Sequence, residues 1–319
     1  MKKNELIQDL YPTRKKTSAE IMKRLDPVVY SNKNTSNKKS LSKNQLDFFE
    51  KNGFLFFPKL FDSTEIDLML FELEKLKKNK KLYSSEQFIL EPESGNVRSI
   101  FEIHKTNSTF GNLSQDYRII NVIEQLLASS VYITQSRINI KPGFEGKEFY
   151  WHSDFETWHS EDGMPRMRAI SCAINLTENY EFNGPLMVIP GSHKFFVSCV
   201  GETPNNNYLY SLKKQKIGTP DKKILDKFAQ DMGIVSVKGP PGSAVFFDCN
   251  ILHASSGNIT PFPRSNVFIV YNSVENELEE PFCGKKPRPE HIATRKMKRS
   301  TSQDSSLANK FKKITMTKT

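Results

Sequence analysis

Two histidines and an aspartate in this chain have the types and spacing of a metal site. His152 and Asp154 lie two residues apart in the stretch FYWHSDFETWH (149–159), so on a β-strand their side chains would point the same way. A third ligand is needed, and His253 lies at the end of another expected strand. Two histidines and one carboxylate with open positions form the facial triad of non-haem Fe(II) oxygenases. A zinc hydrolase is compatible with the same three ligands.

An arginine that follows His253 in the sequence bears on the choice between these chemistries. The guanidinium of Arg264 is charged at any working pH and binds a carboxylate through two parallel hydrogen bonds. Such a fork suits a dicarboxylate co-substrate, 2-oxoglutarate, whose other end chelates the iron. Taken alone, Arg264 in ITPFPRSN is equally well interpreted as a surface turn residue. The triad, the spacing and the arginine together favour an Fe(II)- and 2-oxoglutarate-dependent oxygenase that uses O2.

The segments that must position these residues are short and alternate in polarity. From about residue 131, period-two segments are separated by Gly, Pro and Asn turns, as in all-β barrels and sandwiches. We therefore expect a mainly β fold, a double-stranded β-helix (jelly-roll, cupin-like) core with flanking α-helices. The expected strands are residues 131–141, 148–154, 167–176, 185–189, 243–248 and 266–272.

Two helices are predicted ahead of these strands. Ser42 followed by Gln45 forms a capping box, and Gly53 supplies a C-terminal stop. Asp62 and Glu65 cap a second helix, which carries a single apolar stripe. We interpret the second helix as a packing element and assign no chemistry to it.

The strand expected at residues 131–141 separates its side chains by polarity. Gln135, Arg137, Asn139 and Lys141 share one face, and the residues between them take the other. Polar residues that alternate in this way usually face water. The alternative is an inward face that lines a polar ligand cavity, as in barrels that hold a small molecule. The nearby metal-site residues favour this second interpretation.

Positive charge is concentrated at the two ends of the chain. The total is +10, with +7 carried by residues 1–43 and +7 by residues 295–319, which leaves −4 for the residues between. A mildly acidic centre argues against a nucleic-acid groove, which needs its cations on the folded face. We expect a basic, partly ordered N-terminal segment (1–42), an Fe(II)/2-oxoglutarate dioxygenase domain (43–294) and a basic, disordered tail (295–319).

The sequence has no membrane or disulfide signal. No run of eighteen apolar residues and no apolar signal-peptide region is present, and the four cysteines form no CxxC pair. We expect a soluble, cytoplasmic protein with reduced thiols and no membrane partner. Contact of the basic tail with nucleic acid or a membrane is the minor alternative.

Several segments resemble a known family. They are DLYPTRK, QSRINIKPGF, GKEFYWHSDFETWHSEDGMPRMRA, NGPLMVIPGSH, CVGETP and GNITPFPRSNVFIVYNSVEN. Together they span about residues 9–293 and resemble the ectoine hydroxylases, a branch of the phytanoyl-CoA dioxygenase superfamily. The resemblance implies a double-stranded β-helix enzyme, usually a homodimer. It also implies hydroxylation of ectoine, a compatible solute, to 5-hydroxyectoine, with succinate and CO2 as co-products.

The same resemblance assigns roles to individual residues. The iron ligands match His152, Asp154 and His253. The 2-oxoglutarate site matches Lys141, Arg264, Asn139, Phe149 and Ser171. The substrate site matches Gln135, Trp158, Phe101, Phe247 and Phe268, where an aromatic cage would attract the cationic amidine of ectoine. Without the resemblance, Trp158 is better interpreted as an ordinary core residue.

Two rival functions remain open from the sequence. One is the same oxygenase chemistry on another small zwitterion such as proline, and a panel of substrates would separate it from ectoine hydroxylation. The other is a non-catalytic jelly-roll that binds a metal or a solute. The complete triad together with Arg264 is hard to explain on that second view, which predicts no consumption of 2-oxoglutarate.

Overall fold

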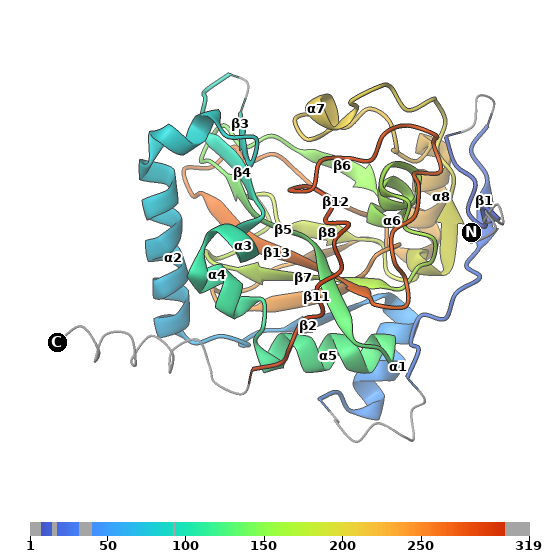
Figure 1. The fold of residues 1–319 in the computed structure, drawn as a ribbon, viewed down its shortest axis with the longest axis horizontal. Helices are drawn as coiled ribbons and strands as arrows, with labels where there is room; N and C mark the ends of the chain where they lie inside the picture. The colour runs from blue at the N-terminus through green and yellow to red at the C-terminus, as the bar shows by residue number, and fades with distance from the viewer. Residues whose placement is uncertain (1–7, 15–17, 32–39, 92, 304–319) are drawn as a thin grey trace, which may run out of the picture.

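The computed structural model describes residues 8–14, 18–31, 40–91 and 93–303, and antiparallel sheets form its centre (Figure 1). The large sheet has the strand order β2-β11-β7-β13-β5-β4-β3, and the small sheet has the order β10-β8-β12-β6. A third sheet pairs β1 with β9. The strands are β1 (Ile21–Lys23), β2 (Phe54–Phe57), β3 (Phe88–Leu90), β4 (Val97–Phe101), β5 (Val131–Lys141), β6 (Phe149–His152), β7 (Ala169–Asn175), β8 (Leu186–Val188), β9 (Phe195–Val197), β10 (Val235–Val237), β11 (Ala244–Asp248), β12 (His253–Ser255) and β13 (Arg264–Ser273). The expected mainly β architecture is confirmed.

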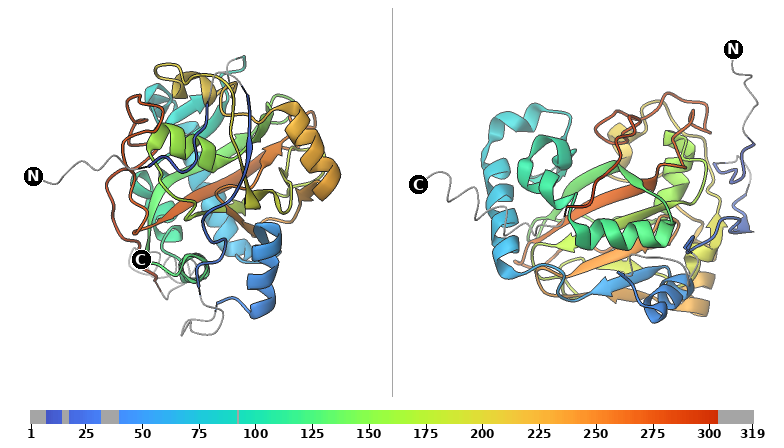
Figure 2. Two further views of the ribbon diagram at one scale, coloured as in Figure 1. Left: turned by 90° about the vertical axis from the view of Figure 1, so that its right-hand side faces the viewer. Right: turned by 60° about the horizontal axis from the view of Figure 1, so that its bottom comes forward.

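The two larger sheets pack against each other through apolar side chains. Val245 and Phe247 of the large sheet share one buried cluster with Leu186 and Val188 of the small sheet. The opposite face of the large sheet is covered by helices, and α5 contacts both β5 and β7 (Figures 1 and 2). This face holds the largest hydrophobic core, in which the isoleucines of α5 meet those of the sheet. Burial of this apolar area is the main source of stability.

The helices in the described ranges are between four and sixteen residues long. They are α1 (Lys43–Asn52), α2 (Ser63–Lys78), α3 (Ile103–Thr106), α4 (Ser108–Leu113), α5 (Tyr117–Leu127), α6 (Asp154–Thr157), α7 (Tyr208–Ser211) and α8 (Lys222–Met232). The 3-10 turns are η1 (Lys80–Ser84) and η3 (Ser192–Lys194), and η2 (Trp158–Asp162) is a π-helical turn. None of the helices in the described ranges is both long and apolar enough to cross a bilayer.

Both predicted capping boxes are present. The Ser42 hydroxyl accepts from the Gln45 amide while the Gln45 side chain returns to the Ser42 amide, and Gly53 ends α1 at a φ of 79°. Asp62 and Glu65 form the same reciprocal pair at the start of α2. Because each box satisfies two amide groups that the helix leaves unpaired, local sequence fixes where both helices begin.

The polar face of β5 points into the protein, toward the small sheet. Register places Lys141 opposite Arg264 and Arg137 opposite Phe268 on β13. Phe268 belongs to the apolar cluster between the sheets, whereas Ile138 belongs to the core under the helices. The expectation that this face points inward, and not toward water, is therefore confirmed.

A β-bulge at Thr134 ends the simple alternation along β5. Gln135 lies opposite Val270 and Ile133 lies opposite Tyr271, so Thr134 has no partner on β13. A bulge inserts one residue and exchanges the two faces beyond it. Ile133 consequently joins Tyr271 in the core on the helix side of the sheet.

Both described ends of the chain contact the folded domain. At the N-terminal side, β1 pairs with β9. At the C-terminal side, Arg299 bridges Tyr132, and the Ser300 amide donates to the Val131 carbonyl at 2.7 Å. The sequence placed a tail from residue 295, whereas in the structure residues 299–300 pair with β5 and Gln303 pairs with Asp116; residues 304–319 lie outside the described residues.

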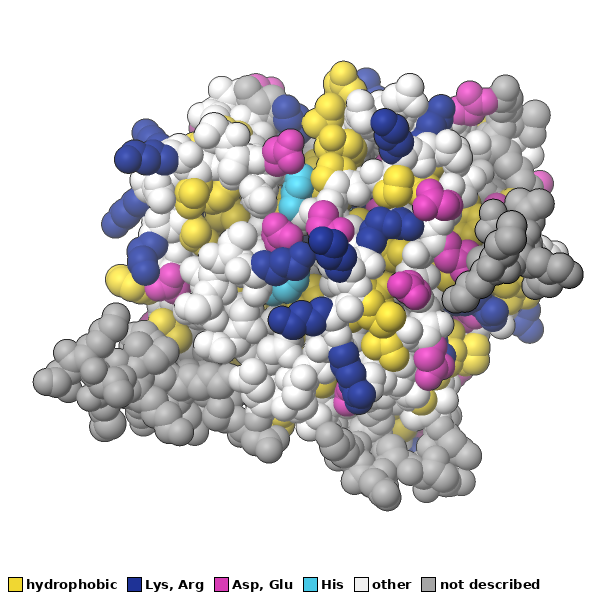
Figure 3. Space-filling model, viewed as in Figure 1, with side chains coloured by type: hydrophobic (Ala, Val, Ile, Leu, Met, Phe, Trp, Pro, Cys, Tyr) yellow, Lys and Arg dark blue, Asp and Glu magenta, His cyan; other side chains and the backbone are white. Residues whose placement is uncertain are grey.

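The C-terminal segment crosses the face of the molecule that carries many cations. Lys105, Lys296, Lys298 and Arg299 line a surface cavity of about 580 Å³ there. Figure 3 shows Lys and Arg side chains gathered over the middle of this face. The basic composition of residues 295–319 agrees with the exposed, positively charged surface found here. It did not predict that residues 295–303 pack on the folded domain.

Candidate metal centre and substrate cavity

The two histidines of the predicted triad face each other across paired strands. The register of β6 with β12 places His152 opposite His253, and their ring centroids are 4.2 Å apart. The Nδ1 of His152 lies 2.6 Å from the Tyr150 carbonyl oxygen, and that of His253 lies 3.0 Å from the Ile251 carbonyl oxygen. Because a carbonyl only accepts hydrogen bonds, each Nδ1 carries the proton. Each Nε2 is therefore left with a lone pair for a metal.

Asp154 reaches the same centre from a helix. Ser153 is the N-cap of α6, which begins at Asp154. The Ser153 hydroxyl donates to the Asn250 Oδ1 at 3.0 Å, and the Phe155 amide donates to the Cys249 carbonyl at 2.8 Å. The expectation that Asp154 lies on a strand is wrong, because Ser153 caps a helix that begins at Asp154. These flanking bonds to residues 249–250 hold the carboxylate beside the histidines.

The three side chains are close enough to share one metal ion. An Asp154 oxygen lies 3.7 Å from the His152 Nε2, and the other oxygen lies 3.8 Å from the His253 Nε2. All three ligand atoms fall within 4.8 Å of one another, and this is the one such group found among the described residues. Two imidazole nitrogens and a carboxylate oxygen suit Fe(II) and leave coordination positions open. The residues present therefore fit the implied iron.

Electrostatics keep these ligands in the forms that bind a cation. Burial and the neighbouring His152 lower the pKa of His253 to about 4, so its imidazole is neutral near neutral pH. Burial alone would raise the pKa of Asp154, but His253, His152 and Arg137 hold it well below its ordinary value. A neutral imidazole and an ionised carboxylate both donate lone pairs to a metal without first losing a proton.

Buried cations gather around the ring of Phe149. The Lys141 Nζ lies 5.1 Å from the ring centroid and the Arg98 guanidinium lies 4.1 Å from it. Arg264 stands opposite Lys141 on the adjacent strand. The ion pair of this cluster joins Arg98 to Glu91 at 2.9 Å. Three buried cations with one paired carboxylate leave excess positive charge in a region of low dielectric.

This excess charge and the unused donors nearby favour an anionic ligand. Burial, Arg98 and Arg137 lower the pKa of Arg264 to about 9, and burial with Arg264 holds the pKa of Lys141 well below its ordinary range. The Arg264 Nη1 donates to the Gly184 carbonyl at 2.7 Å, and its Nη2 lies 3.4 Å from the Asn139 Oδ1. The Arg264 Nε and the Ser171 hydroxyl have no hydrogen-bond partner among the described residues. A bound carboxylate would accept from such donors and offset the charge.

The metal centre opens into a cavity of about 60 Å³. Its wall includes His152 and Asp154 together with the predicted ligand-binding residues Gln135, Phe149 and Trp158. The Gln135 side-chain amide donates to the Ile292 carbonyl at 2.8 Å, so the C-terminal segment lies against this wall. Trp158 is only 5% exposed and also packs in an apolar cluster, so it serves both as core and as cavity wall.

The three phenylalanines predicted for a substrate cage lie beside Arg137 and His253. Phe101 and Phe268 lie on either side of Arg137 along the sheet, with ring centroids 5.9 and 5.4 Å from its guanidinium. Phe247 instead packs against His253, with centroids 5.3 Å apart. Arg137 lines the 60 Å³ cavity, whereas these three rings stand behind its lining residues. The rings therefore support the arginine and one metal ligand.

Sequence reasoning missed four charged residues of this region. Arg137 was noticed on the polar face of β5 but received no role, although its position on that face was the available signal. Arg98, Glu161 and Arg288 carry no local motif. Glu161 and Arg288 both line the cavity, and Arg288 donates to Asp162 through Nε and Nη2 at 2.7 and 2.6 Å.

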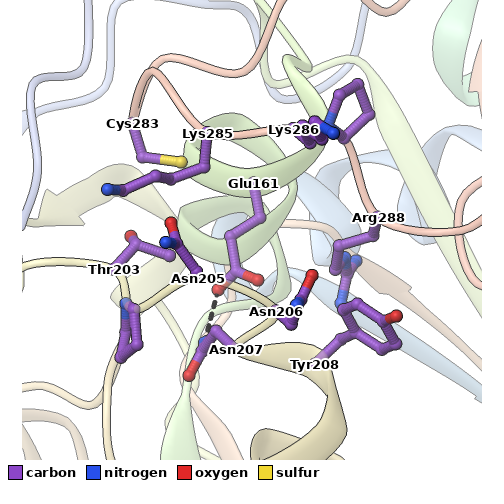
Figure 4. A pocket seen from close by; sticks show the side chains of 12 residues that line it. Glu161, Thr203, Asn205, Asn206, Asn207, Tyr208, Cys283, Lys285, Lys286 and Arg288 are labelled. Carbon is purple, nitrogen blue, oxygen red and sulfur yellow. Dashed lines mark hydrogen bonds between the residues drawn. The ribbon is translucent and has the colours of Figure 1, made fainter.

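A second cavity adjoins the first. It measures about 270 Å³, and Glu161, Asn207 and Arg288 line both spaces. Figure 4 shows the Glu161 carboxylate bonded to the Asn207 side chain in the middle of this wall, with Arg288 to one side. The Asn207 Nδ2 donates to the Glu161 Oε1 at 2.8 Å. This pair separates the metal-side cavity from the outer one.

Comparison with known proteins identifies what the chain is similar to. The phytanoyl-CoA dioxygenase (PhyH) family matches residues 49–266. The sequence is 52% identical over 288 residues to the ectoine dioxygenase of Bordetella bronchiseptica, which covers 90% of this chain and 93% of that protein.

Solved structures give the same similarity. The crystal structure of EctD from S. alaskensis with 2-oxoglutarate and 5-hydroxyectoine matches with a TM-score of 0.84 and 43% identity, covering 94% of this chain and all of that one. The crystal structure of the same protein with bound Fe matches with a TM-score of 0.84, 42% identity and the same coverage.

Proposed function

This chain belongs to the phytanoyl-CoA dioxygenase family and, within it, to the ectoine dioxygenases, and from that membership we propose that it hydroxylates ectoine to 5-hydroxyectoine. The reaction uses Fe(II), 2-oxoglutarate and O2 and yields succinate and CO2. The observation that carries the proposal is the His152, Asp154 and His253 cluster together with a buried group of cations whose charge is only partly compensated.

In this proposal the three clustered side chains hold the iron. His152 and His253 present Nε2 because their Nδ1 atoms are engaged by backbone carbonyls, and Asp154 supplies an ionised oxygen. The chemistry supplied by bound iron is activation of O2, with 2-oxoglutarate as the co-substrate that is oxidised. The protein contributes ligand orientation, and its buried cavity keeps bulk water from the reacting atoms.

Arg264 is proposed to bind the distal carboxylate of 2-oxoglutarate. Its fork is buried and has an unused Nε, and Lys141, Asn139, Phe149 and Ser171 lie on the same face or beside it. A dianion placed here would neutralise charge that the described residues leave uncompensated. This explains energetically why three cations are buried together with only one paired carboxylate.

The substrate is proposed to bind along the wall formed by Gln135 and Trp158. Ectoine carries a cationic amidine and a carboxylate. The face of Trp158 can attract the cation, and Arg137 provides a charge for the carboxylate, with Phe101 and Phe268 holding that arginine in place. Phe247 acts through its packing on His253.

The test is anaerobic reconstitution with Fe(II) and 2-oxoglutarate, followed by addition of air and ectoine. We expect succinate and an ectoine product heavier by one oxygen atom, formed in equal amounts. Proline in place of ectoine is the matched control. Succinate coupled to oxidised proline, with ectoine unchanged, would reassign the substrate, and no 2-oxoglutarate consumption with any compound would reject the oxygenase.

We also propose that the protein forms a homodimer, as its sequence resemblance implies. A patch that a second copy would cover consists of the exposed residues Phe144 (68%), Phe182 (53%), Ile259 (83%) and Phe262 (53%). The patch is continuous, because the Tyr180 ring contacts those of both Phe182 and Phe262, and the Phe144 amide bonds to the Thr260 carbonyl. Exposed apolar patches of this kind mark contact surfaces.

Light scattering at micromolar concentration tests the dimer. Ile259→Lys should shift the mass toward one chain, whereas Phe71→Lys, at an exposed position on α2, should leave it unchanged. A monomeric parent protein would reject this proposal.

The proposed location is the cytoplasm. All four cysteines are unpaired, which agrees with a reducing compartment. Cell fractionation with an antibody to the protein checks the location directly.

A further inference from the structure

The N-terminal segment formed by residues 9–14 binds the stretch of chain that follows Asp154. The Asp9 carboxylate lies 2.9 Å from the His159 Nε2. The Tyr11 ring packs edge-on against Phe155, with centroids 5.2 Å apart. These contacts join residues separated by more than 140 positions in the sequence. Residues 9–14, the described part of the DLYPTRK motif, are therefore a structural partner of α6 and η2.

Arg14 makes the strongest of these contacts. Its Nε and Nη2 donate to the two carboxylate oxygens of Glu156, both at 3.0 Å, and its Nη1 donates to Glu161 at 2.5 Å. Both carboxylates and the guanidinium are buried. A bidentate fork shared between two buried carboxylates fixes their positions more tightly than a single ammonium group would.

The backbone of Arg14 is held in an uncommon conformation. Its φ is 55°, in the left-handed region that favours glycine. An arginine that persists there is held by its surroundings, and such residues cluster at functional sites. The side-chain partners of Arg14 among the described residues do not include a metal ligand, so its effect on the reaction must pass through those partners.

One of those partners, Glu161, lines the substrate cavity. Its carboxylate also accepts from Asn207, and Figure 4 shows this bond. The Arg14 Nη1 donates to the Thr203 hydroxyl as well, at 2.8 Å. Arg14 therefore ties the helical wall to the loop that carries Asn207. The metal ligand Asp154 has separate anchors at residues 249–250.

We infer that Arg14 is a positioning residue for substrate binding, acting through Glu161 and the 203–207 loop. The inference rests on the proposed ectoine hydroxylation. With the fork removed, Glu156 and Glu161 remain as buried carboxylates without their cation, and the wall between the two cavities loses its fixed position. Substrate affinity falls while the iron site, which is held by the separate bonds to residues 249–250, is retained.

Arg14→Gly is the informative variant, because glycine accepts the positive φ and the effect then reports the side chain alone. We expect KM for ectoine to rise by about tenfold or more, with kcat changed less than about threefold. Added guanidinium ion should lower KM again by filling the vacated fork site, whereas the same concentration of sodium chloride should not. Lys23→Ala, which removes an exposed cation from the same end of the chain, is the matched control.

A second measurement does not depend on turnover. The chain has two tryptophans, so in a Trp151→Phe background the emission reports Trp158 in the cavity wall. Ectoine is titrated anaerobically into the Fe(II)-loaded Trp151→Phe protein, with and without Arg14→Gly. The protein with Arg14→Gly should bind ectoine about tenfold more weakly, and its affinity for Fe(II) should stay within about threefold. Thr203→Val, which keeps every charge, should weaken ectoine binding in the same direction by a smaller factor.

The outcomes separate this inference from the proposed function. If the parent protein oxidises ectoine and Arg14→Gly leaves both KM and ectoine binding unchanged, the inference is wrong while the function stands. Loss of active protein with an unchanged KM in the remainder would show a purely structural role and would also overturn it. A parent protein that never oxidises ectoine rejects the proposed function instead.

Discussion

Backbone carbonyls orient the metal ligands, whereas buried ion pairs hold the neighbouring cavity wall. His152 and His253 each donate to a carbonyl two residues earlier in their own chain segment. Glu161, in the wall, depends on Arg14 from the N-terminal segment and on Asn207 from a surface loop. The metal centre is thus built from local carbonyl contacts, the pairing of β6 with β12 and the anchoring of Ser153 and Phe155 to residues 249–250. The wall instead rests on a buried ion pair from the N-terminal segment and a hydrogen bond from a loop.

The difference predicts that metal binding and substrate binding respond separately to mutation. Carbonyl partners belong to the backbone, so they survive side-chain substitutions around them. An ion pair fails when either partner is removed, and the remaining charge is left buried. Substitutions at the metal ligands, at the cation cluster and in the wall should therefore give distinct combinations of lost iron affinity, raised KM for 2-oxoglutarate and raised KM for substrate.

The largest effect is expected at the metal centre. Asp154→Ala removes the one carboxylate of the triad, and we expect turnover to fall by roughly 1,000-fold or more together with weaker Fe(II) binding. Bound iron and succinate formation are the two measurements. Asp231→Ala, at an exposed position on α8, is the control. Full turnover by Asp154→Ala would refute its assignment as a ligand.

The next effect should appear in the KM for 2-oxoglutarate. Arg264→Gln removes the buried fork, and we expect this KM to rise roughly 100-fold, as for loss of a charge-assisted pair worth about 3 kcal/mol. Iron binding should change little, because Arg264 does not contact the triad. Arg299→Gln, at an exposed position, serves as the control, and an unchanged KM in Arg264→Gln would remove this residue from the co-substrate site.

A smaller and more selective effect is expected in the wall. Trp158→Ala should raise the KM for ectoine by about 20-fold, since it removes an aromatic face from the cavity, and Trp158→Phe should raise it only a few-fold. Steady-state kinetics with each substrate varied in turn are the measurement. The matched Trp151→Phe change should leave both KM values alone. Equal effects of the two Trp158 variants would argue that shape, rather than the aromatic face, matters.

The contrast between local contacts and contacts between distant segments also explains which features could be predicted from the sequence. The two capping boxes, the polar face of β5 and the paired spacing of His152 and Asp154 are all local signals. His253 was found because few histidines exist and one follows an expected strand, although β12 is only three residues long. Alternation failed at the Thr134 bulge and at Asp154, where a cap turned the expected strand into a helix.

The rest of the site depends on contacts that no local pattern records. Arg98 and Arg288 reach the region from β4 and from the C-terminal segment, and Arg14 from the N-terminal segment. Each is an ordinary arginine in its own sequence neighbourhood. Their burial follows from tertiary packing, which a single sequence does not give. The end of the folded domain was misplaced for the same reason, since residues 295–303 are ordered by pairing with distant segments.

A histidine outside both regions should affect stability and leave activity nearly unchanged. Burial lowers the pKa of His193 to about 4, as at His253, but His193 packs on Gly53 and lies apart from the triad. Between about pH 6.5 and pH 4 this histidine is protonated in the unfolded chain but stays neutral in the folded protein, so stability falls as pH falls. At pH 5 this amounts to about 2 kcal/mol relative to pH 7.

His193→Gln removes that proton-linked loss. The free energy of unfolding in urea should be measured at pH 7 and at pH 5. Its decrease from pH 7 to pH 5 should be about 2 kcal/mol smaller in the variant than in the parent, because any packing that the variant loses lowers both values alike. Turnover of ectoine at pH 7 should stay within about twofold, because the ring contacts neither the metal ligands nor the cavity lining. An identical pH dependence in variant and parent would mean that the His193 ring takes up its proton as readily in the folded protein as in the unfolded chain. In that case burial would not be what keeps an imidazole neutral at this position.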